Sequence, residues 1–579
     1  MKVSSLFVGA VLTGSAFGLV PGVPGLPGAA NAVPSNIASG VSSVIAGAAS
    51  SAASAVSSAV PAAASSGLAN ASSRIASAAS AQSTGKKIQL TITTANSRGA
   101  TGVSPKVIAT VLLDTATDIL STLSVPGIPF LKRRLSQRRQ EVELSKRAMP
   151  PLRWQYYQSS PKIRGVNLGG WLVLEAWMTP SVFAATGNPN IVDEWGFGSM
   201  QPRDQAISIM QNHLNTFMSE SDIQQIAAAG LNHVRIPIPY WAFEVAAGEP
   251  YLKLNQYDLL KQAVMLCNKY NIKVLVELHT APGSQNGYDH GGRRGVNQWA
   301  SNPSYVNRTI AILQTMSQEF SQSKYANVVT AIELLNEPVT DQNVVMDFNA
   351  RAYEVVRYPN GRNATASPLL IVLSDDFISP AVSAYWNQSA LPPQYEAVSI
   401  DSHVYTVFSD QGRALSNSDR LAYYCSLKPK WAGATTIHPQ IIGEWTPAYT
   451  DCAAGVNGRN TAAGTSDCYA RSGDASTFTP AYKAMLGKMW EAQVDSAEGG
   501  KGWMMWSWKT EAMAAEDWSY QKGLQYGWIP RDPTKRPQGI NCNLPSTYNN
   551  VDATTTTTST AQTQTKSSGG GFLGGIFGF

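Results

Sequence analysis

Two glutamates stand near the ends of apolar runs and are candidates for paired carboxylate chemistry. Glu337 follows the run VVTAIELLN at residues 328–336, and Glu444 lies in QIIGEW at residues 440–445. An apolar, β-branched run that ends in polar residues is typical of a parallel strand buried on both faces, with its carboxyl end at a ligand site. A plain strand-to-loop boundary would give the same pattern at Glu337. The chemistry therefore depends on whether the two glutamates meet.

Two carboxylates that face each other across a cleft are what glycosidic bond cleavage requires. One donates a proton to the leaving oxygen, and the other meets the oxocarbenium-like carbon. At a separation of about 5 to 5.5 Å, Glu444 attacks the anomeric carbon directly and configuration is retained. Asn336 is placed to bind the sugar 2-hydroxyl, and Tyr405 is placed to orient Glu444. No cluster with metal-ligand spacing accompanies these residues, so we predict neither a metal nor a cofactor.

The elements that must position these residues alternate between apolar runs and stretches of helical period. Eight candidate strands begin at Gly165, His233, Lys273, Val328, Pro368, Ala397, Gln440 and Gly502. Between them lie amphipathic stretches such as SESDIQQIAAAG at residues 219–230, which opens with a capping serine and closes with glycine. This alternation predicts an α/β fold, a (β/α)₈ TIM barrel with loop insertions. A doubly wound open sheet is the alternative, but no glycine-rich phosphate fingerprint follows the first strand.

If the eight strands close, the last residues of every strand share one rim, where active sites of this fold are built. The strand ends supply Glu175, Arg235, His279, Asn336, Glu337, His403, Tyr405, Glu444, Trp506 and Trp508. Structural ion pairs account for one or two of these residues, for example Arg235 beside a carboxylate. They do not easily account for all of them. The histidines His213, His233, His290 and His438 have no strand-end placement, and we predict that they are surface or core residues.

Composition bounds the class of protein. The chain has 579 residues, of which 44% are hydrophobic and 14% are charged, so it is able to bury at least one large core. Its net charge of +5 is mild, and much of the positive charge lies at residues 131–147. The charge gives no argument for nucleic acid, and no nucleic-acid partner is predicted.

The N-terminal flank resembles segments that are removed during export. Residues 1–18 place a lysine before a short apolar run and small residues, which is the layout of a signal peptide, with cleavage after residue 18 or 32. Residues 19–147 are Ala/Ser-rich and then basic, and we predict a propeptide that ends at the dibasic pair Lys146-Arg147. A cytosolic chain and a linker that stays attached are the alternatives. The Asn-X-Ser/Thr sequons at Asn70, Asn307, Asn363 and Asn387 support export.

The C-terminal flank, residues 549–579, is a Thr/Ser/Gly-rich tail of the kind that carries O-linked sugars. Small residues and a short apolar end suggest a glycolipid anchor signal, but the polar spacer of such signals is missing. Outside the tail there is no run of 18 apolar residues, so no membrane-spanning helix is predicted. The barrel domain is therefore expected at residues 148–548.

Six motifs in this region carry a family resemblance. They are RGVNLGGWLVLEAWMTP, ELHTAPGSQNGYDH, ELLNEP, DSHVYTVF, IIGEWTPAYTDC and GWMMWSWKTE, in chain order. Together they resemble the secreted fungal exo-beta-1,3-glucanases of glycoside hydrolase family 5, and the resemblance covers about residues 160–545. It implies a secreted or cell-wall enzyme, expected as a monomer, that releases glucose from the non-reducing ends of β-1,3-glucan with retention. It also implies some transfer of glucose to other sugars.

The resemblance also implies roles for individual residues. Glu337 serves as acid/base and Glu444 as nucleophile. The residues expected around the innermost sugar are Glu175, Arg235, His279, Asp289, Asn336, His403, Tyr405 and Trp506. Tyr288 and Phe408 match an aromatic pair that clamps the next sugar, although Tyr288 stands where the family has Phe. An exo enzyme also needs loops that close one end of the cleft, and insertions around residues 180–215 and 446–475 are candidates.

Five cysteines leave one without a disulfide partner. Cys267 lies on the apolar face of a predicted helix and is expected to be a buried thiol. Spacing leaves several pairings open for the others, and the resemblance favours Cys425 with Cys542 and Cys452 with Cys468.

Three functions are compatible with these features. The first is the retaining exo-hydrolase of β-1,3-glucan. The second keeps the chemistry but acts on β-1,6-glucan or attacks within the chain. The third is a glucan-binding wall protein without catalysis, against which the presence of both glutamates argues.

Overall fold

The computed structural model describes residues 162–381, 383, 386 and 396–552. The predicted signal peptide and propeptide lie outside these residues, as do the tail from residue 553 onward and the sequons at Asn70 and Asn387.

Within the described residues, eight parallel strands form one closed barrel in chain order, and β8 pairs with β1. The strands are β1 (Ile163–Asn167), β2 (His233–Ile238), β3 (Lys273–Leu278), β4 (Val329–Glu333), β5 (Leu370–Ser374), β6 (Val398–Val404), β7 (Gln440–Trp445) and β8 (Gly502–Met505). The barrel predicted from the sequence is confirmed. Its closure brings the carboxyl ends of all eight strands to one rim.

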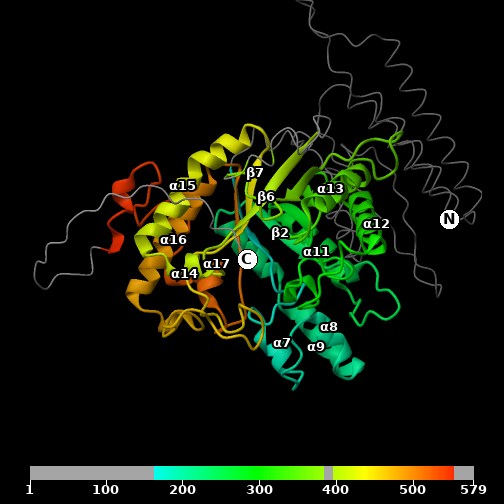
Figure 1. Cartoon of the computed structure of the whole chain (residues 1–579), viewed down its shortest axis with the longest axis horizontal. Helices are drawn as coiled ribbons and strands as arrows, with labels where there is room; N and C mark the ends of the chain where they lie inside the picture. The colour runs from blue at the N-terminus through cyan, green and yellow to red at the C-terminus, as the bar shows by residue number, and fades with distance from the viewer. Residues whose placement is uncertain (1–161, 382, 384–385, 387–395, 553–579) are drawn as a thin grey trace, which may run out of the picture. The chain divides into compact units, whose positions relative to one another are not determined.

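Helices pack around the barrel (Figure 1), and within the described residues they lie between all successive strands except β5 and β6. The longer ones are α9 (Arg203–Thr216), α10 (Glu220–Ala228), α11 (Gln256–Lys269), α12 (Pro303–Phe320), α13 (Gln342–Arg357), α15 (Asn417–Thr435) and α16 (Pro480–Ala497). Shorter ones are α7 (Pro180–Ala184), α8 (Glu194–Ser199), α14 (Asp410–Ala414) and α17 (Tyr520–Tyr526). Helix α10 begins at a capping box between Ser219 and Asp222. It ends before Gly230, whose φ of 73° favours glycine.

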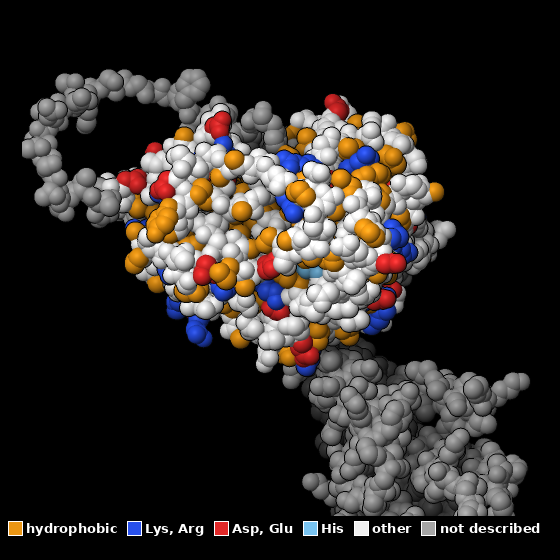
Figure 2. Space-filling view, turned by 90° about the horizontal axis from the view of Figure 1, so that it is seen from below, with side chains coloured by type: hydrophobic (Ala, Val, Ile, Leu, Met, Phe, Trp, Pro, Cys, Tyr) orange, Lys and Arg blue, Asp and Glu red, His pale blue; other side chains and the backbone are white. Residues whose placement is uncertain are grey.

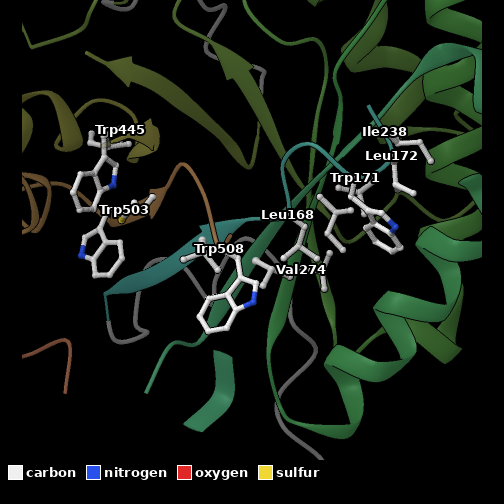
Figure 3. Close-up of a cluster of buried hydrophobic side chains, with 14 of the residues drawn as sticks. Leu168, Trp171, Leu172, Ile238, Val274, Trp445, Trp503 and Trp508 are labelled. Atoms are coloured by element: carbon white, nitrogen blue, oxygen red, sulfur yellow. The ribbon is translucent and has the colours of Figure 1, made fainter. Parts of the chain in front are cut away.

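The core has two parts, because successive side chains of a strand point to opposite faces of the sheet. Outward-facing residues pack against the helices, and Figure 3 shows part of this cluster, including Leu168, Val274 and Trp503. Inside the barrel lies a smaller apolar layer of Ile163, Leu275, Ala331, Leu370, Val372, Ile441 and Met504. Arg235 of β2, Glu277 of β3, Glu333 of β4 and Asp401 of β6 form a buried polar network. An apolar layer thus coexists with a charged layer that contacts the candidate site.

Two disulfides confirm the favoured pairings. Cys425 of α15 is bonded to Cys542, and Cys452 is bonded to Cys468 in the loop after β7. Cys267 is a buried free thiol, as expected.

Among the described helices, none is long and apolar enough to cross a membrane. Acidic and basic side chains are interspersed over the face shown in Figure 2, without a large patch of one sign.

Candidate active site

The candidate acid/base lies directly beyond β4 in an unusual backbone conformation. Glu337 has a φ of 44°, which residues other than glycine rarely adopt. Two hydrogen bonds hold the turn. The backbone N–H of Asn336 donates to the backbone carbonyl of Leu278, and the side-chain amide of Gln285 donates to the backbone carbonyl of Asn336. Such conformations cost on the order of 1 to 3 kcal/mol and cluster at functional sites. The strained turn is consistent with a need to aim this carboxylate at the cleft.

Glu337 and Glu444 lie close together on the rim. One oxygen of each carboxylate and one ring nitrogen of His403 lie within 4.8 Å of one another. The Nδ1 atom of His403 is 2.6 Å from Glu337 Oε1 and 3.5 Å from Glu444 Oε2. This spacing matches the separation of about 5 to 5.5 Å in retaining glycosidases rather than the about 6.5 to 9.5 Å in inverting ones.

Both oxygens of Glu444 receive hydrogen bonds. Arg235 Nη1 donates to Oε1 at 2.8 Å, and the Tyr405 hydroxyl donates to Oε2 at 3.0 Å. Burial raises the pKa of Glu444, while His403 and Arg235 oppose this rise. The donors fix the orientation of the carboxylate and stabilise its charged form. Tyr405 thus contacts Glu444, as expected from the sequence.

Arg235 lies beneath the site and is fully buried. Its guanidinium donates to Glu333 at 2.8 and 3.2 Å and to the Asn336 side-chain oxygen at 2.9 Å. Because it also binds Glu444, it connects the two strands that carry the candidate glutamates. Arg235 therefore orients residues that face the cleft. Its ion pair with Glu333 is the structural ion pair that the sequence predicted for Arg235.

His403 and Glu337 form a charged pair. Burial opposes the imidazolium, but the carboxylates of Glu444 and Glu337 outweigh burial and raise the pKa of His403 well above 6.5. Burial alone would raise the pKa of Glu337, yet the His403 imidazolium outweighs it and lowers the pKa to about 2. The pair thus holds one proton in the hydrogen bond between His403 and Glu337 and titrates as a unit.

His279, Trp506 and Asn336 form one wall of the site. His279 Nδ1 lies 2.9 Å from Glu277 Oε2, and burial lowers the pKa of this histidine to about 3, so the ring is neutral. The Trp506 ring stacks on it with centroids 5.8 Å apart. Gly169 makes room for Trp506, because a Cβ there would lie 2.6 Å from the indole. The buried Nδ2 of Asn336 has no hydrogen-bond partner among the described residues and is available to a sugar hydroxyl.

Glu175 and Asp289 supply two further buried carboxyl groups. The Trp177 indole donates to Glu175 Oε2 at 2.8 Å. Burial, assisted by the charge of Asp289, raises the pKa of Glu175 well above 4.5. Burial also raises the pKa of Asp289, whose Oδ2 has no hydrogen-bond partner among the described residues. Buried carboxyl groups with unused hydrogen-bonding capacity suit a ligand rich in hydroxyl groups.

The predicted aromatic clamp consists of residues with different surroundings. Phe408 is 49% exposed, and its ring centroid is 5.3 Å from that of Tyr405. The Tyr288 ring lies 5.3 Å from the His290 ring, and burial raises the pKa of its hydroxyl to about 12. Tyr288 is thus a neutral hydrogen-bond donor near Glu337.

The two predicted insertions contact each other. Arg459, in the loop after β7, donates to the carbonyls of Asn188 and Ile191 in the loop after β1. A third loop joins them, because Arg294 donates to the Arg459 carbonyl at 3.0 Å and to Thr461 Oγ1 at 2.8 Å. Gly455, in the loop after β7, faces Trp177, whose indole donates a hydrogen bond to Glu175. Three loops therefore form a continuous wall on the Glu175 side of the rim.

The structure corrects two expectations from the sequence. His290 is not a bystander, since its Nε2 lies 3.6 Å from Glu337 Oε2. Trp508, expected on the rim, instead packs in the outer core (Figure 3). Its indole donates to Asp222 of α10 at 3.1 Å. By contrast, His213 and His233 are buried core residues, as predicted. The position of His290 in the motif ELHTAPGSQNGYDH, next to Asp289, was the signal that could have identified it.

Two groups of side chains have atoms close enough to suit a metal ion, namely Glu333, Asp401 and His403, and Glu337, His403 and Glu444. Arg235 already contacts Glu333, Asp401 and Glu444 at 2.8 to 3.8 Å. A second cation beside this guanidinium would be repelled, and the His403 imidazolium would add to the repulsion. We therefore assign no metal to the site.

A closed (β/α)₈ barrel with two nearby carboxylates on its rim is an arrangement that retaining glycoside hydrolases use. The chain matches the family model described as cellulase (glycosyl hydrolase family 5) over residues 201–510. It is 36% identical over 412 residues to a glucan 1,3-beta-glucosidase of Pichia angusta, covering 68% of this chain and 91% of the relative. It is 38% identical over 415 residues to a probable glucan 1,3-beta-glucosidase A of Aspergillus niger, covering 69% and 96%.

Among solved structures, a rutinosidase from Aspergillus niger superposes with a TM-score of 0.51 at 21% identity, covering 64% of this chain and 98% of the other. This likeness supports the fold. The chain belongs to glycosyl hydrolase family 5.

Proposed function

We propose that this protein is a retaining exo-hydrolase that releases glucose from the non-reducing ends of β-1,3-glucan. The observation that carries the proposal is the pair Glu337 and Glu444, whose nearest oxygens lie within 4.8 Å and whose surroundings differ. The choice of substrate is supported by the names of the two relatives, both glucan 1,3-beta-glucosidases.

In the first step, Glu444 attacks the anomeric carbon while the leaving oxygen takes a proton from Glu337. Arg235 and Tyr405 hold the two oxygens of Glu444 so that one of them faces the sugar. Attack neutralises Glu444, and His403 thereby loses one of the charges that raise its pKa. The proton shared by His403 and Glu337 then becomes easier to give away as the glycosidic bond breaks.

In the second step, Glu337 acts as a base. It removes a proton from a water molecule that attacks the glycosyl-enzyme, so that β-glucose is released and Glu444 is restored. A sugar hydroxyl in place of water would give transfer instead of hydrolysis. The exposed ring of Phe408 and the hydroxyl of Tyr288 offer surfaces on which such an acceptor can rest.

The exo mode is supported by the wall formed by the loops after β1, β3 and β7. The hydrogen bonds of Arg459 and Arg294 join these loops on the side of Glu175. A glucan chain that enters from the opposite side would end against this wall with a single sugar in the innermost position.

We also propose export, with residues 1–18 as a signal peptide and cleavage of a propeptide after Arg147. A cell-wall substrate outside the cell is consistent with this route. We further propose that the protein acts as a monomer.

A proton NMR time course on residues 148–549 with a linear β-1,3-glucan tests the proposed function. We expect β-glucose to appear first and no ladder of oligosaccharides, because a retaining exo-enzyme removes one sugar at a time. A ladder would indicate endo attack, and α-glucose would contradict retention. Release of glucose from β-1,6-glucan alone would replace the proposed β-1,3 linkage with the alternative one.

The pH dependence of kcat/KM should be bell-shaped. On the acidic side, we expect activity to fall as Glu444 becomes protonated, at a pH above the ordinary 4.5 because burial raises the pKa of Glu444. On the basic side, it should fall as the His403–Glu337 pair loses its proton, above the 6.5 of an ordinary histidine. Tyr405→Phe removes a donor to Glu444, so it should move only the acidic limb, toward higher pH. An acidic limb that stays in place in this variant would contradict the assignment.

A further inference from the structure

His290 lies against the acid/base on the side opposite His403. Its Nε2 is 3.6 Å from Glu337 Oε2, whereas His403 Nδ1 binds Glu337 Oε1 at 2.6 Å. Each oxygen of this carboxylate therefore faces one histidine. Two contacts on two different oxygens determine the plane of a carboxylate, which a single contact leaves free to rotate.

The imidazole of His290 is held in place by its neighbours. It belongs to the short 3₁₀ helix η3 (Asp289–Gly291), and its backbone N–H donates to Asp289 Oδ1 at 3.0 Å. Its ring centroid lies 5.3 Å from that of His279 and 5.3 Å from that of Tyr288. The turn that follows is tightly packed, since a Cβ at Gly291 would lie 2.4 Å from the Asn286 side chain. The side chain of His290 is therefore held in position before substrate binds, and 18% of it is exposed to solvent.

The protonation state of His290 suits a hydrogen bond to a carboxylate. The titratable groups that face it are Glu337 beyond β4, His279 beyond β3, His403 of β6 and Asp289 of its own helix. Burial lowers the pKa of His290 despite the nearby carboxylates, which favours the neutral ring with one proton. Its Nδ1 is buried without a hydrogen-bond partner among the described residues, and Nε2 faces Glu337. The tautomer with the proton on Nε2 is favoured because it gives the carboxylate a donor.

We propose that His290 is a positioning residue that acts through Glu337: its Nε2–H holds Oε2 while His403 holds Oε1, so that the carboxyl group stays aligned with the scissile bond. The inference deepens the proposed function and rests on the assignment of Glu337 as acid/base. At 3.6 Å the contact is longer than a hydrogen bond, and catalytic hydrogen bonds of this kind shorten when substrate closes the site.

The test measures kcat/KM on aryl β-glucosides whose leaving groups range from poor to good. Poor leaving groups need a proton from Glu337, whereas dinitrophenolate does not. We expect His290→Ala to lower kcat/KM about three- to tenfold on poor leaving groups, the loss of one hydrogen bond, and to leave the dinitrophenyl glucoside nearly unchanged. His290→Gln should restore much of the loss, because its side-chain amide can donate from a position near that of Nε2.

Two controls separate positioning from folding. His438→Ala changes a half-buried histidine that precedes β7 at the opposite end of the barrel, and it should affect neither substrate class. Melting temperatures of all variants show whether an activity change reflects lost structure. An equal loss on good and poor leaving groups, no loss on either, or a Gln variant no better than Ala would overturn the inference.

The outcome can also be distinguished from failure of the proposed function. If the wild type cleaves aryl glucosides but not β-1,3-glucan, the proposed substrate is wrong and the role of His290 is still decided by the leaving-group series. If Glu337→Gln itself shows no dependence on the leaving group, Glu337 is not the acid. That result would overturn both the proposed mechanism and the inference.

Discussion

Glu444→Gln should lower kcat for glucan by on the order of 10⁴-fold while glucan binding persists. An amide of the same shape cannot attack the anomeric carbon, but its oxygen still accepts from Arg235, whose partners Glu333 and Asn336 are unchanged. The variant should therefore fold and keep the substrate in place. Turnover is checked by glucose release, and binding is checked by titration with a short β-1,3-glucan oligosaccharide.

Glu498→Gln is the matched control, because Glu498 makes an ion pair with Arg164 far from the rim and such partly exposed pairs contribute little. A Glu444→Ala variant adds a chemical readout. Azide bound in the place of the missing carboxylate attacks the anomeric carbon of the β-glucoside in a single displacement. This inverts the configuration of that carbon, so the product should be α-glucosyl azide. A near-normal rate for Glu444→Gln, or a β-azide product, would remove Glu444 as the nucleophile.

The elements of the barrel were predictable because their signals are local. The runs HVRIPI and QIIGEW match β2 and β7 from first residue to last. One boundary differs where the backbone is unusual. The fifth run, PLLIVLSDD at residues 368–376, forms a strand only to Ser374, and Asp376 and Phe377 beyond it both have positive φ. A left-handed conformation at two residues that are not glycine is set by the fold and leaves no mark in the sequence.

The candidate site was predictable to the extent that strand ends share a rim. Glu337, Glu444 and Tyr405 meet as expected, because closure of the barrel brings the ends of β4, β6 and β7 to one rim. The support beneath them was missed. Glu333 was interpreted as part of an apolar run, yet it binds Arg235, which lies 98 residues away in the chain. Alternation along one strand does not reveal which carboxylate on another strand neutralises a buried guanidinium.

His290 was missed for a related reason. The expectation that functional residues lie at strand ends overlooks residues that a loop folds back over the rim. The loop after β3 does this, because Ser284, Gly287 and Gly292 have positive φ and η3 turns the chain toward Glu337. The site is thus a rim of strand ends completed by side chains from loops, and only the first part follows from strand periodicity.

Glu337→Gln should have an effect that depends on the leaving group. For glucan, whose leaving sugar needs a proton, we expect kcat/KM to fall by about 10²- to 10⁴-fold. For dinitrophenyl β-glucoside, which leaves without a proton, kcat/KM should stay close to the wild-type value. The second step still lacks its base, so the glycosyl-enzyme should accumulate and produce a burst of dinitrophenolate followed by a slow steady state.

The burst also tests how the roles are divided between the two glutamates. During the slow phase, mass spectrometry of peptides should find the glucosyl group on Glu444, whose two oxygens Arg235 and Tyr405 hold in orientation. Glu337→Ala with azide should give β-glucosyl azide. Azide needs no base to attack the glycosyl-enzyme, and its attack inverts the anomeric carbon that Glu444 inverted in the first step. An equal loss on glucan and on the activated substrate would contradict the acid role. The His403–Glu337 pair holds the proton that the leaving group receives. If the acid were a group outside this pair, the fall of activity at basic pH would no longer report the titration of the pair.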